Sequence, residues 1–329
     1  MNIRILGAGF YGCHIASALL DDGHQVAIFE SRSGIFEGAS GNIPARLHQG
    51  FHYPRSKATR DACQQHEAEF MAVYGEFTRR VPYNLYAIAA DRSLVDFAQY
   101  EDSLHGEVEF EVVDPAEYGL QHVEGALLTT ERHIVISEVR QYFLAKLAPY
   151  IRYNTVPYEV DDPLYDLTID ATFCAYDEQS IDRYEPCIVG LLKGPIDVAV
   201  TIMDGPFGSL YPWDEDLGLS SLSSAKWTPI TKNCHTHAEA QAILGRVSHD
   251  TAAAQFAGMY ADLRHYYPAL DSYDYAGCMF SVRAMPLSGA DSRLVDIVLV
   301  GKQAIRIRAG KLDAVVSTAR EIKRMIDDG

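Results

Sequence analysis

The chain has 329 residues, of which 48% are apolar, and a formal net charge of −17. This length is enough for two domains. The negative charge argues against nucleic acid or an anionic membrane as the main partner, and no stretch approaches the roughly 18 consecutive apolar residues of a membrane span. The six scattered cysteines, which lack zinc-like spacing, are typical of free thiols in a reducing compartment. Because the chain starts with a strand-like segment rather than a cleavable leader, we expect a cytoplasmic protein without a membrane span.

The first 30 residues predict one parallel βαβ unit. Residues 2–9 form a short apolar strand, residues 13–23 have helical spacing with Gly23 as the stop, and residues 24–30 form a second apolar strand. Strand, glycine turn, helix and strand in this order give parallel strands, and the crossover is almost always right-handed.

An amphipathic helix is predicted for residues 57–79. Helical spacing places Ala62, Phe70, Val73 and Phe77 roughly on one face of this helix, so we expect that face to be buried.

A further helix is predicted at residues 137–150, with Ser137 as its N-cap and Pro149 near its end. Strands are expected near 151–160 and within 165–173, and they return the chain to the parallel sheet.

Other stretches are rich in aromatic and β-branched residues, which is typical of a more antiparallel sheet. These stretches are 81–90, 107–114, 195–213 and 217–227. Residues 236–267 then predict one or two helices, and residues 293–329 predict a strand, a loop, a second strand and a final helix.

The order of these elements predicts an α/β fold, α+β overall, in which a substrate domain is inserted into a Rossmann-like nucleotide domain. We expect the nucleotide domain to combine residues 1–80, 131–185 and 276–329. The inserted, mostly antiparallel β domain would combine residues 81–130 and 186–275.

The turn after the first strand has the pattern GxGxxG, with Gly7, Gly9 and Gly12. The first glycine permits the tight turn, the second lets the backbone approach a pyrophosphate, and the third allows close helix–strand packing. Glu30 ends the next strand, where its carboxylate can accept hydrogen bonds from the two adenosine ribose hydroxyls. The pattern therefore predicts a dinucleotide site, and it does not choose between NAD and FAD.

The segment after Glu30 makes that choice. Gly38, Ala39, Ser40 and Asn42 match a loop that lies along the pyrophosphate, ribityl chain and flavin in one family. The chain thus resembles the D-amino-acid oxidase/glycine oxidase superfamily of FAD-dependent oxidoreductases. The segment Leu47 to Ser56, "LHQGFHYPRS", further resembles the branch that contains L-2-hydroxyglutarate oxidising enzymes.

Later segments extend the resemblance. Asp166 to Phe173 resembles the family's strand ending in an Ala-Thr-Gly turn, although Phe173 stands where glycine is usual. The segment "GCMFSVRAMP" resembles the strand whose arginine often binds the substrate carboxylate, which implies that role for Arg283. The segment "IRAGKLDAVVSTAREI" resembles the closing loop and helix whose start, here Gly310 and Lys311, faces the flavin pyrimidine.

The resemblance implies a glutathione-reductase-type FAD-binding domain with FAD as the cofactor. The cofactor-binding residues that we expect are Gly7, Gly9, Gly12, Glu30, Ser31, Arg32, Ala39, Ser40, Asn42, Val156, Ala171, Gly310 and Lys311.

Three residues are candidates for catalysis. His52 could accept a proton from a substrate hydroxyl or amine, since an ordinary histidine pKa lies near neutrality; the alternative is a packing role. Arg283 is a cation on an apolar strand, and either a substrate carboxylate or a structural acid could pair with it. Tyr211 could line the same cavity or belong to the core, and Arg55 and Arg306 are weaker electropositive candidates.

Two further patterns carry little weight. Cys278 is placed like the cysteine that holds flavin covalently in monomeric sarcosine oxidase relatives, but a lone cysteine in an apolar strand is usually a small buried residue. His235 and His237 have no third ligand placed by the sequence, so no metal is predicted.

The resemblance implies an FAD-dependent oxidoreductase that oxidises a CH–NH or CH–OH centre of a small, carboxylate-bearing substrate by hydride transfer to flavin N5. Two alternatives remain open: a biosynthetic flavoprotein acting on a sugar or larger precursor, and a non-catalytic flavin- or dinucleotide-binding regulatory protein. For the oxidoreductase, the expected partner is a small-molecule substrate and not nucleic acid. The sequence leaves open whether the protein forms a homo-oligomer.

Overall fold

A parallel sheet forms one half of the molecule. The computed structural model describes residues 1–156, 162–173, 175–176, 181–286, 295–301, 303–308 and 310–328. Within these residues the sheet's strands are, in spatial order, β16 (Asp296–Val300), β17 (Ala304–Arg308), β10 (Leu167–Asp170), β1 (Asn2–Leu6), β2 (Gln25–Phe29) and β9 (Ile151–Arg152). The strands from β17 to β9 run parallel, whereas β16 joins the edge antiparallel.

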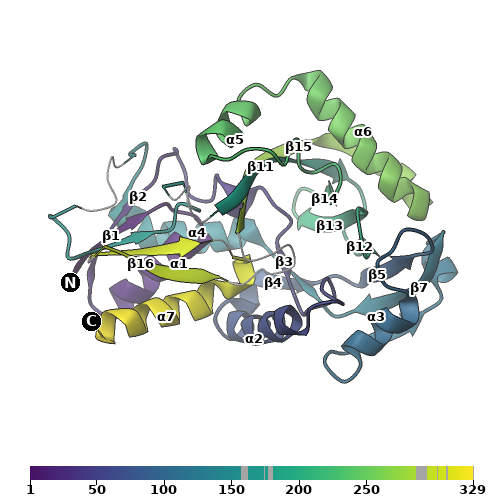
Figure 1. The fold of residues 1–329 in the computed structure, drawn as a ribbon, viewed down its shortest axis with the longest axis horizontal. Coiled ribbons are helices and arrows are strands. Elements are labelled where there is room, and N and C mark those ends of the chain that lie inside the picture. The colour runs from purple at the N-terminus through teal and green to yellow at the C-terminus, as the bar shows by residue number, and fades with distance from the viewer. Residues whose placement is uncertain are drawn as a thin grey trace.

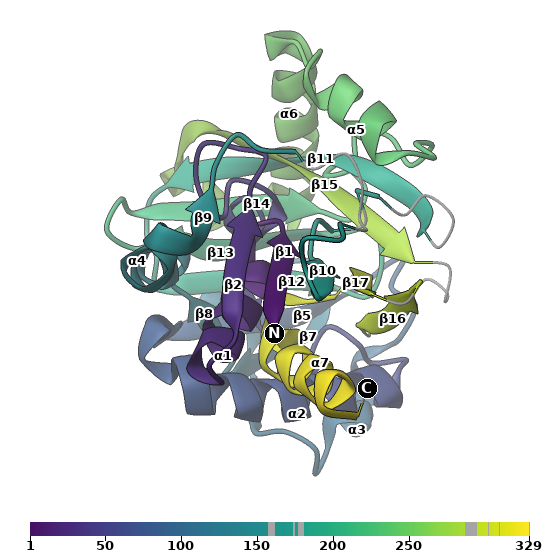
Figure 2. The ribbon, with the colours of Figure 1, turned by 90° about the vertical axis from the view of Figure 1, so that its left-hand side faces the viewer.

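Helices from distant parts of the chain pack together beside this sheet (Figures 1 and 2). They are α1 (Phe10–Asp21), α2 (Lys57–Tyr74), α4 (Ile136–Leu147) and α7 (Val315–Asp328). α1 contacts both α4 and α7, and α2 also contacts α7. The ring of Phe10 on α1 lies at the centre of this packing, with its centroid 5.7 Å from that of Phe70 and 5.8 Å from that of Phe143. The central strand β1 is almost wholly buried because both faces of the sheet are covered.

The helix predicted for residues 57–79 is shorter than expected. α2 ends at Tyr74, and a 3₁₀ turn at Gly75–Phe77 and the strand β4 (Thr78–Arg80) follow it. Phe70 and Tyr74 are buried, but Val73 is 47% exposed, so its placement on the buried face was wrong. Val73 precedes Tyr74 by one residue and therefore points about 100° away from it.

The predicted N-cap of the next helix was also wrong. α4 begins at Ile136, so Ser137 lies inside it and Val135 occupies the cap position without a side-chain bond. The amide of Val135 bonds to the carbonyl of Phe77 and Ile136 is buried, so tertiary packing sets this helix start. Pro149 lies in the following 3₁₀ turn, Ala148–Tyr150. Of the strand expected near 151–160, β9 forms the beginning, and residues 157–161 lie outside the described part.

A second, larger sheet forms the other half of the molecule. Its described strands are, in spatial order, β15 (Asp274–Pro286), β11 (Ile181–Lys193), β14 (Leu219–Ser224), β13 (Gly208–Asp214), β12 (Val198–Met203), β5 (Tyr83–Ala89), β7 (Val123–Thr129) and β6 (Phe110–Val113). All neighbouring pairs are antiparallel except β12 with β5. The predicted α/β class with a mostly antiparallel second sheet is therefore confirmed.

Helices and short turns complete this half. α5 (His237–Leu244) and α6 (His249–Tyr266) pack on the sheet, above it in Figure 1, and α3 (Phe97–Leu104) packs on β7. The short strands β3 (Arg46–Leu47), β8 (Arg132–Ile134) and β4 form a three-stranded sheet. The remaining 3₁₀ turns are Ala39–Gly41, Pro115–Tyr118, Pro268–Ser272 and Leu312–Ala314.

The predicted domain boundaries stay a prediction. The second sheet contains β11 and β15 along their full length. It therefore includes residues 181–185 and 276–286, which the predicted division assigned to the nucleotide half. None of the helices in the described part of the chain is long and apolar enough to cross a membrane.

The aromatic packing of α2 is testable by truncation. Replacing Phe70, which is fully buried, with alanine should lower the free energy of unfolding by about 3–5 kcal/mol through lost burial and a residual cavity. The matched control is Val73→Ala on the same helix, which should change it by less than about 0.5 kcal/mol because that side chain is exposed. Denaturant unfolding of both variants measures the difference, and equal losses would contradict the packing described here.

Candidate functional site

The glycine turn between β1 and α1 is held by close backbone contacts. Gly7 has a φ of +93°, and a Cβ at this position would lie 2.8 Å from the carbonyl oxygen of Ala171. A Cβ on Gly12 would lie only 2.0 Å from the carbonyl oxygen of Gly7. Both positions therefore require glycine, as the fingerprint predicts.

The first turn of α1 opens into a cavity. Gly9, Phe10 and Tyr11 line that cavity, and the amide of Phe10 donates to the Ser40 hydroxyl at 3.0 Å. A helix N-terminus presents unpaired N–H groups and the positive end of its dipole, which suits a phosphate group.

Glu30 follows β2 at the edge of the same cavity and is 8% exposed. Its Oε2 accepts a hydrogen bond from the amide of Ala8 at 2.7 Å, and its Oε1 accepts one from the amide of Arg32 at 2.9 Å. The carboxylate therefore ties the glycine turn to the loop after β2 and keeps a fixed position at the cavity edge.

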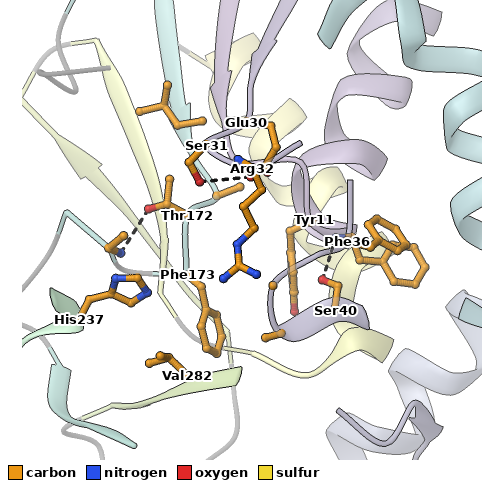
Figure 3. A pocket seen from close by; sticks show the side chains of 18 of the residues that line it. Tyr11, Glu30, Ser31, Arg32, Phe36, Ser40, Thr172, Phe173, His237 and Val282 are labelled. Carbon is orange, nitrogen blue, oxygen red and sulfur yellow. Dashed lines mark hydrogen bonds between the residues drawn. The ribbon is translucent and has the colours of Figure 1, made fainter. Parts of the chain in front are cut away.

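The cavity has a volume of about 550 Å³ and runs between the two halves of the chain (Figure 3). It is lined by most of the predicted cofactor residues: Gly7, Gly9, Glu30, Ser31, Arg32, Ala39, Ser40, Val156, Ala171 and Gly310. Figure 3 shows the Arg32 side chain reaching into the space near Phe173 and Tyr11. A glycine cradle, a helix N-terminus and a carboxylate are the groups that fit a dinucleotide.

Three predicted cofactor residues lie outside this wall. Gly12 is behind the glycine turn, as described above. The amide group of Asn42 donates to the carbonyls of Glu37 and Gly38, and it therefore shapes the loop rather than facing the cavity. Lys311 lies beside the neighbouring cavity, with its Nζ 3.9 Å from the centre of the Tyr53 ring and 2.9 Å from the Cys63 sulfur.

Phe173 has a φ of +60°. Glycine adopts this left-handed conformation without strain, whereas a residue with a Cβ pays on the order of 1–2 kcal/mol for it. The backbone at Phe173 therefore adopts a conformation that favours glycine, and its phenyl ring lies in the cavity wall.

A second cavity, of about 450 Å³, adjoins the first. The two share lining residues, namely Ala39, Ile43, Phe173, Val282, Gly310 and Leu312. Basic and imidazole side chains line the second cavity: Arg46, His48, His52, Arg55, Arg283 and Lys311. The lining also contains the carboxylate of Asp204, so basic side chains outnumber acidic ones there in a chain whose net charge is −17.

Two of these arginines are paired with carboxylates of the protein. Arg283 on β15 donates through Nε and Nη2 to Oε2 of Glu185, its partner across the strand pair, at 2.9 Å for Nε. The structural acid is thus the observed partner, and only the Nη1 side of the guanidinium lies outside this ion pair. Arg55 donates from Nε to Oδ2 of Asp204 at 2.6 Å.

Arg46 is the buried cation of the second cavity, at 6% exposure. Its Nη1 lies 2.6 Å from the Tyr86 hydroxyl and 2.9 Å from that of Thr201, and its Nη2 lies 2.9 Å from that of Ser209. The guanidinium carbon also lies 4.0 Å from the centre of the Tyr211 ring. Hydroxyl and aromatic groups therefore surround this charge.

His52 lines the second cavity beside Arg46. Its Nδ1 is 3.1 Å from Arg46 Nη1 and also 3.1 Å from the Tyr86 hydroxyl. Burial and the Arg46 charge hold the pKa of His52 well below its usual range. Behind it, Tyr86 donates to Oε2 of the fully buried Glu131 at 2.5 Å.

The other candidates lie elsewhere. Tyr211 is 1% exposed, donates to the carbonyl of Arg132 and supports Arg46, so it lies outside the residues lining the two cavities. Arg306 is buried and bonds to Asp170 at 2.8 Å, which joins two strands of the parallel sheet. Cys278 is outside both linings as well, and its sulfur lies 3.5 Å from the Tyr275 hydroxyl.

The site also contains Arg46, Glu131 and His237, which the sequence patterns did not predict as site residues. His237, the first residue of α5, lines the first cavity, whereas only a metal role had been weighed for it. Arg46 had a signal, because it is a charged residue between the apolar Ala45 and Leu47. Glu131 had none, since it sits in a polar loop.

In the described residues no group of three His, Cys, Asp or Glu side chains could hold a metal ion.

Comparison with known proteins identifies the family. A family model described as "FAD dependent oxidoreductase" (DAO) matches residues 2–145. FAD-dependent monooxygenase FPY4 of Fusarium mangiferae is 34% identical over 99% of this chain and 91% of its own length. FAD-dependent monooxygenase kojA of Aspergillus flavus is 28% identical over 100% of this chain and 86% of its own.

Solved structures show the same fold. Glycine oxidase from Geobacillus kaustophilus aligns with a TM-score of 0.75 at 14% identity, covering 99% of this chain and 94% of that one. L-α-glycerophosphate oxidase from Mycoplasma pneumoniae with FAD bound aligns with a TM-score of 0.73 at 12% identity, over 99% and 94%. The chain belongs to the DAO family of FAD-dependent oxidoreductases, and its cofactor is FAD, as the resemblance implied.

The Glu30 carboxylate provides a test of the dinucleotide fingerprint. Replacing Glu30 with alanine should weaken FAD retention by about tenfold to a hundredfold, since a hydrogen bond to a charged group contributes about 1.5–3 kcal/mol. Glu37→Ala is the matched control, because Glu37 belongs to the same loop but not to the cavity wall. Flavin absorbance after dialysis measures retention, and full retention by the Glu30 variant would undercut the fingerprint argument.

Asp313, in the turn before α7, provides a test of stability against pH. Burial raises the pKa of its carboxyl to about 6. The folded protein then keeps this proton between about pH 4 and 6 while the unfolded chain has lost it, so stability falls as the pH rises through that window. Relative to Asp313→Asn, the free energy of unfolding of the wild type should fall by about 2–3 kcal/mol between pH 4 and 7. Unfolding curves at several pH values measure this difference, and a constant difference would contradict a raised pKa.

Proposed function

We propose that the first cavity holds FAD and that the second cavity holds the substrate. In this assignment the glycine turn and α1 face the pyrophosphate, Glu30 faces the adenosine ribose, and Gly310 lies at the flavin end. Lys311 would contribute from the second cavity, while Gly12 and Asn42 would act by shaping the backbone. The continuity of the two cavities carries the proposal, because a cofactor in one would touch a substrate in the other across Phe173 and Val282.

The proposed reaction is oxidation of a CH–OH or CH–NH centre in a small, carboxylate-bearing molecule. Bound FAD supplies the hydride acceptor at flavin N5. The chain's own residues bind and orient the substrate so that the reacting C–H bond points towards the first cavity. Arg46, Arg283 and Lys311 favour an anionic group in the second cavity, since a planar guanidinium matches a carboxylate in charge and geometry.

Oxygenation is the second candidate. It is favoured by the 34% identical relative, which is named an FAD-dependent monooxygenase, and by the kojA relatives of the same name. Labelled dioxygen separates the candidates: label in the product supports oxygenation, whereas hydrogen peroxide with an unlabelled product supports oxidation. A sugar or larger precursor would be revealed by better turnover of such compounds than of free hydroxy acids or amino acids.

Anaerobic reduction of the bound flavin tests the proposed oxidation. A panel of hydroxy acids, amino acids and sugars is mixed with the holoprotein without oxygen, and bleaching identifies a substrate. If no member of such a panel bleaches the flavin, the substrate class proposed here is wrong, and a regulatory role for the bound flavin gains support.

Arg283 tests the proposed carboxylate contact. With a substrate that bleaches the flavin, Arg283→Gln should raise the apparent dissociation constant by about tenfold to a hundredfold through the loss of a charge-assisted bond. Arg183→Gln is the matched control, because Arg183 also pairs with Glu185, at 2.9 Å, but lies outside the cavity wall. Unchanged affinity in the Arg283 variant would remove its carboxylate role.

A further inference from the structure

We propose that His52 is a neutral hydrogen-bond donor to the substrate, with its proton fixed on Nε2 by Arg46, and that it is not a general base. The proposal rests on the proposed function in so far as the second cavity receives the substrate. The state of the imidazole ring itself can be measured without any substrate.

The contact between Arg46 and His52 defines the tautomer. A guanidinium has only N–H donors and no acceptor, and its Nη1 is 3.1 Å from Nδ1 of His52. Nη1 has two hydrogens and three acceptors within reach, since the Tyr86 and Thr201 hydroxyls are 2.6 and 2.9 Å away. His52 therefore shares one of these hydrogens with a hydroxyl, and Nδ1 accepts it with its lone pair. A neutral imidazole carries one proton, so the proton is on Nε2, at the other side of the ring.

The opposite tautomer would have to donate from Nδ1 to the Tyr86 oxygen, which is also 3.1 Å away. That arrangement turns an N–H of His52 towards an N–H of Arg46, because Nη1 bonds to the same tyrosine oxygen at 2.6 Å. Tyr86 does not compete as a donor to Nδ1, since its own hydrogen points to the buried Glu131 at 2.5 Å. Arg46 therefore decides between the two tautomers.

The charges around His52 also oppose a second proton on the ring. Burial lowers the pKa of His52 most, Arg46, His48 and Lys311 lower it further, and Glu131 raises it. Arg46 itself is fixed by Thr201, Ser209 and the Tyr211 ring, so its charge cannot move away when the substrate enters. Arg46 is thus a positioning residue for the imidazole.

A neutral N–H donor serves the substrate differently from a base. It can hold a substrate oxygen and stabilise negative charge that builds on it, as a neutral imidazole can do beside a carbonyl. It offers no lone pair to a protonated amine. With Arg46, Arg283 and Lys311 on the same wall, the cavity favours oxygen acceptors, and we infer that hydroxy acids suit it better than amino acids.

Nuclear magnetic resonance of the holoprotein tests the tautomer directly. Histidine with isotopically labelled ring nitrogens is incorporated, and the His52 signals among the 12 histidines are assigned from the spectrum of His52→Gln. We expect Nε2 to carry the proton and the ring to stay neutral over about pH 5 to 8, where an ordinary histidine changes its charge. A proton on Nδ1, or a cationic ring in that range, would overturn the proposal.

The control for Arg46 uses the same signals. Arg46→Met should raise the pKa of His52 towards its ordinary value and allow both tautomers. Arg55→Gln removes another cation of the same cavity wall that contacts Asp204 instead, and it should leave His52 unchanged. If the Arg46 variant does not fold, the wild-type spectrum still decides, since it reports the tautomer without any substitution.

Kinetics separate a donor from a base. Glutamine retains an N–H near the position of Nε2 but cannot take up a proton, whereas alanine provides neither. For a substrate that reduces the wild-type flavin, His52→Ala should slow anaerobic reduction by about 100-fold and His52→Gln by less than about tenfold. Equal losses in both variants would overturn the donor role. Failure of every compound to reduce the wild-type flavin would instead count against the proposed function, and the spectra would still test the ring.

Discussion

The contact between Gly12 and the carbonyl of Gly7 is the constraint on which the rest of the nucleotide half depends. The absence of a side chain at Gly12 lets α1 start directly against the end of β1. That approach points the first turn of α1 into the first cavity and brings Phe10 into contact with Phe70 and Phe143, so that α2 and α4 close around it. A phosphate-facing helix and an aromatic core therefore come from the same backbone turn.

The second cavity holds its buried cation differently, because no carboxylate in the described part of the chain forms an ion pair with Arg46. Hydroxyls of Tyr86, Thr201 and Ser209 and Nδ1 of His52 accept hydrogen bonds from Arg46, and the Tyr86 and Tyr211 rings lie against its guanidinium. Glu131 lies one hydrogen bond further away, behind Tyr86. A buried charge is costly to desolvate, and this arrangement keeps the positive field of Arg46 directed into the cavity instead of cancelling it locally.

Much of this organisation could be predicted from the chain. The glycine pattern and the acid after β2 predict a dinucleotide site, because these positions depend on local backbone geometry. The choice of FAD came from the resemblance of the loop at Gly38 to Asn42 to one family. The site roles of Arg46 and Glu131 could not be assigned from the sequence, because they depend on contacts between residues of β3, β5, β12 and β13 that only the folded chain brings together. The same holds for Ser137 and Val73, whose positions are decided by tertiary packing rather than by helix propensity. A pairing such as Arg283 with Glu185 needs the strand register, which sequence patterns leave open.

The strand order of the parallel sheet has a consequence for how the protein is made. β1, near the N-terminus, pairs with β10, and β10 pairs with β17, which begins at Ala304. α1 also packs on α7, which ends at Asp328. The ribosome must therefore have released the chain as far as β17 before this sheet can close, and contacts so distant in sequence assemble slowly. The last strand of the second sheet, β15, ends at Pro286, so that sheet can form earlier and the flavin-binding half is expected to mature after it.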